Sequence, residues 1–217
     1  MPIVTPEGGL TAFGYGLSIF AALLLFFAGG LITRGRKTQV STKQLVFCAL
    51  AMALAFVTSY IRLLHMPYGG SVTLFSMLFI CLTGYWFGIR AGLTTGLAYG
   101  ILQFLQEPFV LSFFQVLCDY VLAFAALGLA GAFKNSKNGL AKGYLLGILV
   151  RGAFHALGGY LYWMDYMPEN FPQSLSMLYP LIYNYSFILT EGLLTLAVIS
   201  TPPVRKGLEH IRQMAVE

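Results

Sequence analysis

The chain has 217 residues, of which 58% are hydrophobic and only 10% are charged. Soluble domains carry about a quarter charged residues, so this composition excludes an ordinary water-soluble protein and indicates a membrane protein. The formal net charge is +5, but the basic residues lie in short segments between apolar runs, which is typical of membrane topology and not of nucleic-acid binding. We therefore expect the lipid bilayer, and no nucleic acid, as a partner.

Seven apolar segments approach the roughly 20 residues that a membrane-spanning helix needs. The sequence predicts an all-α, polytopic membrane helix bundle with spans near residues 10–33, 43–64, 72–88, 91–107, 109–132, 143–163 and 177–200. We expect an additional N-terminal transmembrane helix with a basic linker at 1–42. A six-helix membrane domain follows at 43–203, and a short cytoplasmic tail at 204–217.

The distribution of basic residues predicts the orientation. Eleven Lys and Arg residues fall at span ends on one side: Arg34, Arg36, Lys37, Lys43, Arg90, Lys134, Lys137, Lys142, Arg205, Lys206 and Arg212. Basic loops stay in the cytoplasm. We therefore expect a multi-pass membrane protein with its N-terminus outside and its C-terminus in the cytoplasm.

Small residues recur at four-residue spacing in two places, which lets helices approach closely in lipid. One series is Gly84, Gly88, Gly92, Gly96 and Gly100, and the other consists of two interleaved pairs, Ala49 with Ala53 and Ala51 with Ala55. The alanines fit either packing inside the protein or a docking face for another membrane protein. Because no nucleotide-binding motif is present, the energy for any uptake must come from elsewhere.

Three charged residues lie well inside predicted spans, away from the span ends, where a charge is costly and points to a function. Asp119 could receive a polar or cationic ligand from outside, or could pair with another helix. Arg151 and Glu191 lie at similar depth on consecutive antiparallel spans. We expect these two to form a structural ion pair.

A stripe of residues one helical turn apart, His155, Gly159 and Trp163, rises toward an aromatic outer loop. Tyr179 and Asn184 follow on the next span. An acid, a histidine, an amide and several rings at one end of the bundle suit a flat, cationic heteroaromatic ligand.

The sequence resembles the thiamine-specific, ThiT-type substrate-binding subunits (S components) of energy-coupling-factor (ECF) transporters. The likeness covers residues 43–200 and is carried by four segments: YGGSVTL from Tyr68, QVLCDYVLAF from Gln115, the stripe of His155, Gly159 and Trp163, and YPLIYNYS from Tyr179.

The resemblance implies a thiamine pocket lined by Asp119, Tyr120, His155, Gly159, Trp163, Tyr179 and Asn184, in which the acid addresses the aminopyrimidine ring. Phe109 stands where a tyrosine could be expected. The resemblance also implies that residues 43–203 form a substrate-binding domain in a bacterial cell membrane, and that its partners are a transmembrane coupling subunit and the two ATPase subunits that serve it. The coupling subunit would dock on the face that Ala49, Ala51, Ala53 and Ala55 provide.

Other functions stay open from the sequence. The ligand could be another vitamin, such as riboflavin or biotin, or a thiamine precursor. An intramembrane enzyme is less expected, because GxSxG and HExxH motifs are lacking, and a purely structural membrane protein would also suit the small-residue series. We expect no catalytic residue, no metal site and no cofactor, with thiamine as the transported ligand.

Overall fold

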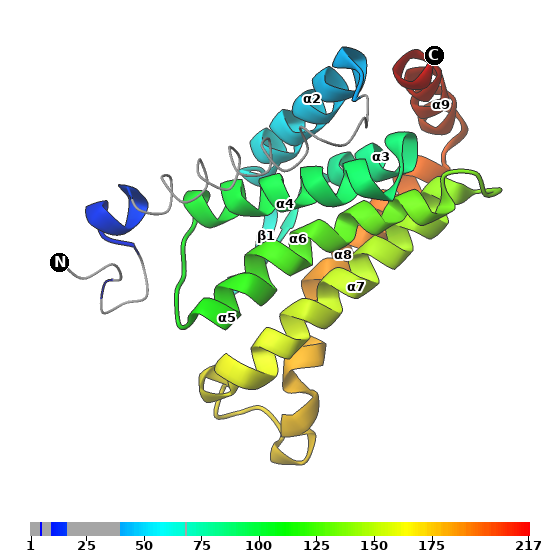
Figure 1. Cartoon of the computed structure of the whole chain (residues 1–217). Coiled ribbons are helices and arrows are strands. Elements are labelled where there is room, and N and C mark those ends of the chain that lie inside the picture. The colour runs from blue at the N-terminus through cyan, green and yellow to red at the C-terminus, as the bar shows by residue number, and fades with distance from the viewer. Residues whose placement is uncertain (1–4, 6–9, 17–39, 68) are drawn as a thin grey trace.

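Helices make up most of the computed structural model, which describes residues 5, 10–16, 40–67 and 69–217 (Figure 1). The additional span predicted at 10–33 lies mostly outside these residues, and of it only residues 12–16 are described as helical.

The first helix of the predicted core, α2 (Thr42–Ser59), begins where Ser41 accepts a hydrogen bond from the Gln44 N–H at 3.1 Å. This side-chain cap satisfies one of the free N–H groups of the first turn. The span predicted at 43–64 is too long, because the chain leaves the helix after Ser59. It continues into an antiparallel hairpin of β1 (Arg62–His65) and β2 (Ser71–Thr73). This hairpin was not predicted from the sequence, because its residues continue the apolar runs on either side.

Two shorter helices follow, α3 (Ser76–Phe87) and α4 (Ile89–Gln106). Gly88 joins them at a φ of 99°, a left-handed conformation that glycine adopts readily. These helices confirm the positions of the spans predicted at 72–88 and 91–107.

The predicted span at 109–132 is a continuous helical segment that changes its pitch. After an extended stretch it begins with α5 (Phe113–Val116), passes through the π-helical turn η1 (Leu117–Leu122) and the short α6 (Ala123–Ala125), and ends as the 3-10 helix η2 (Ala126–Phe133). The π turn holds Asp119. Such turns are rare and often occur at functional sites.

The remaining elements complete the bundle. They are α7 (Gly139–Tyr162), the 3-10 turns η3 (Met164–Tyr166) and η4 (Gln173–Leu178), α8 (Tyr179–Ser200) and α9 (Pro202–Val216). The predicted tail is thus a helix. Its Arg212 donates to the Lys134 carbonyl at 2.8 Å and to the Tyr85 hydroxyl at 3.1 Å, which holds α9 against the bundle.

Four helical segments of the described chain are long and apolar enough to cross a membrane: Thr42–Ser59, Phe113–Phe133, Gly139–Tyr162 and Gln173–Ser200. The predicted all-α membrane bundle is confirmed apart from the hairpin, whereas the predicted number of seven spans is not established.

The glycine series allows the close helix packing that was expected of it. A Cβ on Gly92 would lie 2.7 Å from the Gly128 Cα, so α4 and η2 are in backbone contact.

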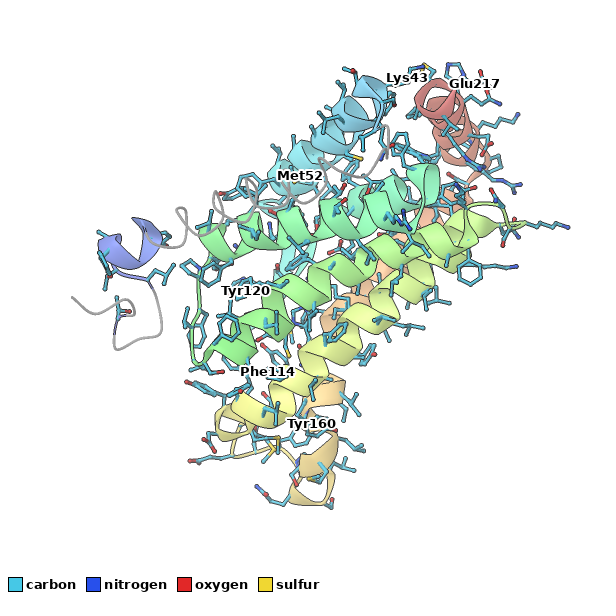
Figure 2. The ribbon with its side chains drawn as sticks, viewed as in Figure 1. Lys43, Met52, Phe114, Tyr120, Tyr160 and Glu217 are labelled. Carbon is cyan, nitrogen blue, oxygen red and sulfur yellow. The ribbon has the colours of Figure 1, made fainter. Side chains whose placement is uncertain are left out.

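The basic segments gather at one end of the molecule. The start of α2, the turn between α3 and α4, the loop between η2 and α7, and α9 all lie there (Figure 1). Lys43 and Glu217 are both labelled at this end in Figure 2. The hairpin, the start of α5 and the two 3-10 turns lie toward the opposite end.

Candidate ligand-binding site

A cavity of about 460 Å³ opens among the hairpin, the π turn, α7 and α8. Small-molecule sites fall in this size range. The structure brings all eight sequence-predicted ligand residues to its lining: Phe109, Asp119, Tyr120, His155, Gly159, Trp163, Tyr179 and Asn184.

Asp119 accepts hydrogen bonds from three side chains. The Gln115 amide donates at 2.8 Å, the indole N–H of Trp163 lies at 3.4 Å, and Nδ1 of His155 lies 3.1 Å from the other carboxylate oxygen. A carboxylate has about four acceptor positions. Asp119 is thus held in one direction and can still accept from a ligand.

His155 uses only one of its two ring nitrogens within the protein. With Nδ1 at Asp119, its buried Nε2 has no hydrogen-bond partner. When Nδ1 carries the proton, Nε2 is an acceptor. His155 therefore offers a second polar atom to a ligand in the cavity.

Tyr120 supports the site through the backbone. Its hydroxyl donates to the Glu107 carbonyl at 2.8 Å and accepts from the Phe109 N–H at 3.1 Å. Both bonds fix the segment before α5. Tyr120 therefore positions the Phe109 ring, in addition to lining the cavity.

Aromatic rings form one wall of the cavity. The rings of Phe109 and Trp163 have centroids 4.9 Å apart and an interplanar angle of 30°, and Tyr166 continues this row at 5.1 Å from Trp163. Tyr179 and Tyr183 lie 5.7 Å apart on α8. Such faces bind flat and cationic ligands.

The cavity depends on a close approach of α7 and α8. A Cβ on Gly159 would lie 2.7 Å from Pro180 Cβ, so a larger residue would push these helices apart. Asn184 donates to the Pro180 carbonyl at 2.9 Å and to the His155 carbonyl at 3.4 Å. Its amide therefore ties the two helices at the level of the site.

The predicted ion pair of Arg151 and Glu191 is wrong. Among the described residues, these two have no nitrogen and oxygen within 4.0 Å. Glu191 instead accepts from the Thr73 N–H and hydroxyl, both at 2.7 Å, and from the Met77 N–H at 3.3 Å. Its charge thus caps the N-terminus of α3, which lacks a side-chain cap of its own.

The docking prediction needs a partial correction. Ala51 and Ala55 are buried against the protein itself, and the Tyr99 hydroxyl donates to the Ala55 carbonyl at 3.1 Å. Ala49 and Ala53 are exposed on the other side of α2. Because the two pairs point in different directions, only Ala49 and Ala53 are exposed for contact with a partner.

Sequence reasoning missed the contribution of the hairpin to the cavity. His65, Gly69 and Ser71 line it, and Tyr183 donates to the Gly69 carbonyl at 2.9 Å. Gly70 lies flush against Phe187, since a Cβ there would be 2.6 Å from that ring. Two consecutive glycines, such as Gly69 and Gly70, are typical of a turn, but no local pattern in the sequence indicates that this turn folds onto α8.

The model of the thiamine transporter protein family matches residues 45–208. The chain belongs to this family. It is 33% identical over 190 residues to the thiamine transporter ThiT of Bacillus subtilis (strain 168), covering 76% of this chain and 94% of that protein. The fold is similar to a solved structure of ThiT from Listeria monocytogenes, with a TM-score of 0.58 and 23% identity over 74% of this chain and 94% of that one.

Family membership confirms the resemblance drawn from the sequence. The relatives are named as transporters, so the expectation of a protein that is not an enzyme is confirmed as well. Together with the four apolar helical segments, the family makes this chain a multi-pass membrane transport protein.

Proposed function

We propose that this protein captures thiamine in the cavity described above and delivers it to the cell as the S component of an ECF transporter. The carboxylate of Asp119 among the aromatic rings carries the proposal. Thiamine consists of two flat rings joined by a methylene group: an aminopyrimidine that offers an amino donor, and a thiazolium that carries one positive charge. An acceptor held in place by three donors suits the first ring, and the rings of Phe109 and Trp163 suit the second.

The charges in the cavity favour a monocation. Asp119 and Glu191 contribute two negative charges and Arg151 one positive charge. Glu107 at the rim is paired with Arg62 at 2.7 Å. The net charge of the lining is therefore close to −1, which one thiazolium would neutralise.

Titration of the purified chain in detergent tests the ligand. The chain has two tryptophans, and Trp86 does not line the cavity, so quenching by thiamine should arise at Trp163. Saturable quenching that is lost in Trp163→Phe is the expected result. No binding of thiamine, or preferential binding of riboflavin, biotin or a thiamine precursor in competition, would reject thiamine as the ligand.

Coupling to an ATP-driven module is the second part of the proposal, because the chain has no nucleotide-binding motif of its own. The exposed pair of Ala49 and Ala53 on α2 offers a flat surface for a helix of the coupling subunit. The Ala49→Trp/Ala53→Trp variant should bind thiamine normally but lose thiamine uptake in cells. Leu193→Trp, at another exposed position on α8, is the control and should keep uptake; equal uptake by both variants would reject this surface.

A further inference from the structure

A second pocket opens at the basic end of the molecule, at the turn between α3 and α4 (Figure 1). Its volume is about 350 Å³. The turn and the end of η2 supply its lining, which consists of Phe87, Gly88, Ile89, Arg90, Gly131 and Lys134. Within the residues that the structure describes, this basic pocket thus contains two cations and no acid.

The charges of Arg90 and Lys134 are not neutralised by the protein. The described part of the chain forms three ion pairs, and neither side chain takes part in any of them. Two like charges that line one small pocket repel each other. An anion that binds between them would remove this repulsion, so the basic pocket favours a negatively charged ligand.

The fold directs Lys134 toward the turn that carries Arg90. Gly131 lets η2 lie against this turn, because a Cβ there would overlap a backbone nitrogen of α4. The ammonium of Lys134 lies 3.7 Å from the position that a Cβ on Gly88 would take. Arg212 donates to the Lys134 carbonyl at 2.8 Å and so fixes the point from which the lysine side chain extends.

The basic pocket lies at the level of the lipid headgroups. Lys134 directly follows Phe113–Phe133, a helical segment that is long and apolar enough to cross a membrane. A chain that leaves the hydrocarbon core at this point enters the headgroup region, which contains the lipid phosphates. The lining also includes two apolar side chains, the half-buried Phe87 and Ile89, which is 39% exposed. Cations beside exposed apolar groups suit an amphiphile better than a free anion.

We propose that the basic pocket binds the phosphate group of an anionic phospholipid, with Arg90 and Lys134 at the phosphate and Phe87 and Ile89 beside the start of the acyl chains. A guanidinium can pair with two phosphate oxygens at once, and an ammonium adds a point charge. A zwitterionic lipid has the same phosphate but also carries an ammonium group, which the two cations repel. This site is separate from the proposed thiamine site, because none of its four side chains lines that cavity.

Native mass spectrometry of the full chain in detergent tests this site by measuring how much added lipid stays bound. The probes are phosphatidylglycerol and phosphatidylcholine with identical acyl chains. The variant Arg90→Gln/Lys134→Gln removes both cations of the basic pocket. Arg205→Gln/Lys206→Gln is the matched control, because it removes two exposed cations of α9 that lie at the same end but do not line the pocket. Since both variants have the same net charge, their comparison separates the pocket from a general attraction of the basic end.

The unmodified chain should bind phosphatidylglycerol about 10-fold more tightly than phosphatidylcholine, since each basic residue near a phosphate contributes to the difference. This preference should fall to about twofold or less in the pocket variant and persist in the control. Equal binding of the two lipids by the unmodified chain, or an equal loss of preference in both variants, would overturn the inference. Displacement of phosphatidylglycerol by inorganic phosphate would also overturn it, because the pocket would then bind free phosphate.

Two further comparisons guard against an effect on folding. The exchange variant Arg90→Lys/Lys134→Arg keeps both charges and should keep the preference for phosphatidylglycerol; loss of the preference would contradict recognition by charge. If Arg90→Gln/Lys134→Gln does not fold, Lys134→Gln is compared with Lys206→Gln. The preference should then fall about threefold in the first variant and stay unchanged in the second, and equal values would reject the site.

Discussion

Asp119 is oriented before any ligand arrives. Its carboxylate is held by the neighbouring Gln115, by His155 of α7 and by Trp163, which directly follows that helix. Side chains fixed in this way lose little freedom when a ligand binds, which favours affinity. The same donors also make the negative charge tolerable within a membrane-spanning helix.

Replacing Asp119 with asparagine should weaken thiamine binding about 10- to 100-fold, because the charge and one acceptor oxygen are lost while the shape is kept. Calorimetry in detergent measures the change. Glu169→Gln removes an exposed acid outside the cavity and should leave the affinity unchanged. A similar affinity in both variants would mean that the carboxylate does not contact the ligand.

Glu191 links three elements of the fold, because its carboxylate on α8 accepts hydrogen bonds from β2 and from the start of α3. The junction it holds includes Phe75 at a φ of 63°. A left-handed conformation is unfavourable for such a residue. The capping bonds from Glu191 offset that cost and fix the base of the hairpin that lines the cavity.

Glu191→Gln should lower the free energy of unfolding by about 2 kcal/mol, because charge-assisted hydrogen bonds to the α3 start are weakened. Thermal unfolding in detergent measures this, and Glu209→Gln on the exposed side of α9 is the control. A double-mutant cycle should find Glu191 coupled more strongly to Thr73 than to Arg151. Stronger coupling to Arg151 would restore the ion pair that the geometry rejects.

The close contact between α7 and α8 leads to a second prediction about how the helices pack. Gly159→Ala forces a Cβ within 2.7 Å of Pro180 and should cost about 1–3 kcal/mol of stability as well as thiamine affinity. Gly207→Ala on α9 meets no atom within 4 Å and should be neutral or slightly stabilising. Thermal unfolding of the two variants compares them directly, and equal melting temperatures would show that the helices have room to separate.

The whole molecule has a basic end and an opposite end that carries the cavity, and the charge bias predicts that the basic end faces the cytoplasm. In intact cells, a membrane-impermeant maleimide should therefore label Glu169→Cys but label Lys137→Cys only after permeabilisation. The unmodified chain, in which Cys81 and Cys118 are buried and Cys48 is half-buried, is labelled in parallel, and its signal from Cys48 is subtracted as the blank. The reverse pattern would invert the proposed orientation.

The sequence predicted those parts of the molecule that depend on local spacing. Asp119, the stripe from His155 to Trp163, and the glycine contacts of α3 and α4 all follow from helical periodicity. The partners of Arg151 and Glu191 could not be predicted in this way. Depth along two helices does not reveal that a third segment, at Thr73, is closer to the carboxylate.

The hairpin was missed for a related reason. Leu63 and Leu64 are exposed, and in a membrane protein exposed apolar residues give no alternation that separates a strand from a helix. The contacts of Gly69, Gly70 and Thr73 with α8 give this segment its place in the cavity.

The π turn at Leu117–Leu122 has a consequence for insertions and deletions. Relative to an α-helix, it accommodates one extra residue, so the parts of the helix before and after it differ in phase by about 100°. The π turn itself directs Asp119 into the cavity, and the part after it directs Gly128 against Gly92. Deleting one residue between these positions would preserve the helix but turn one of the two faces away from its contact. The number of residues separating Asp119 from Gly128 is therefore constrained as strongly as their identities.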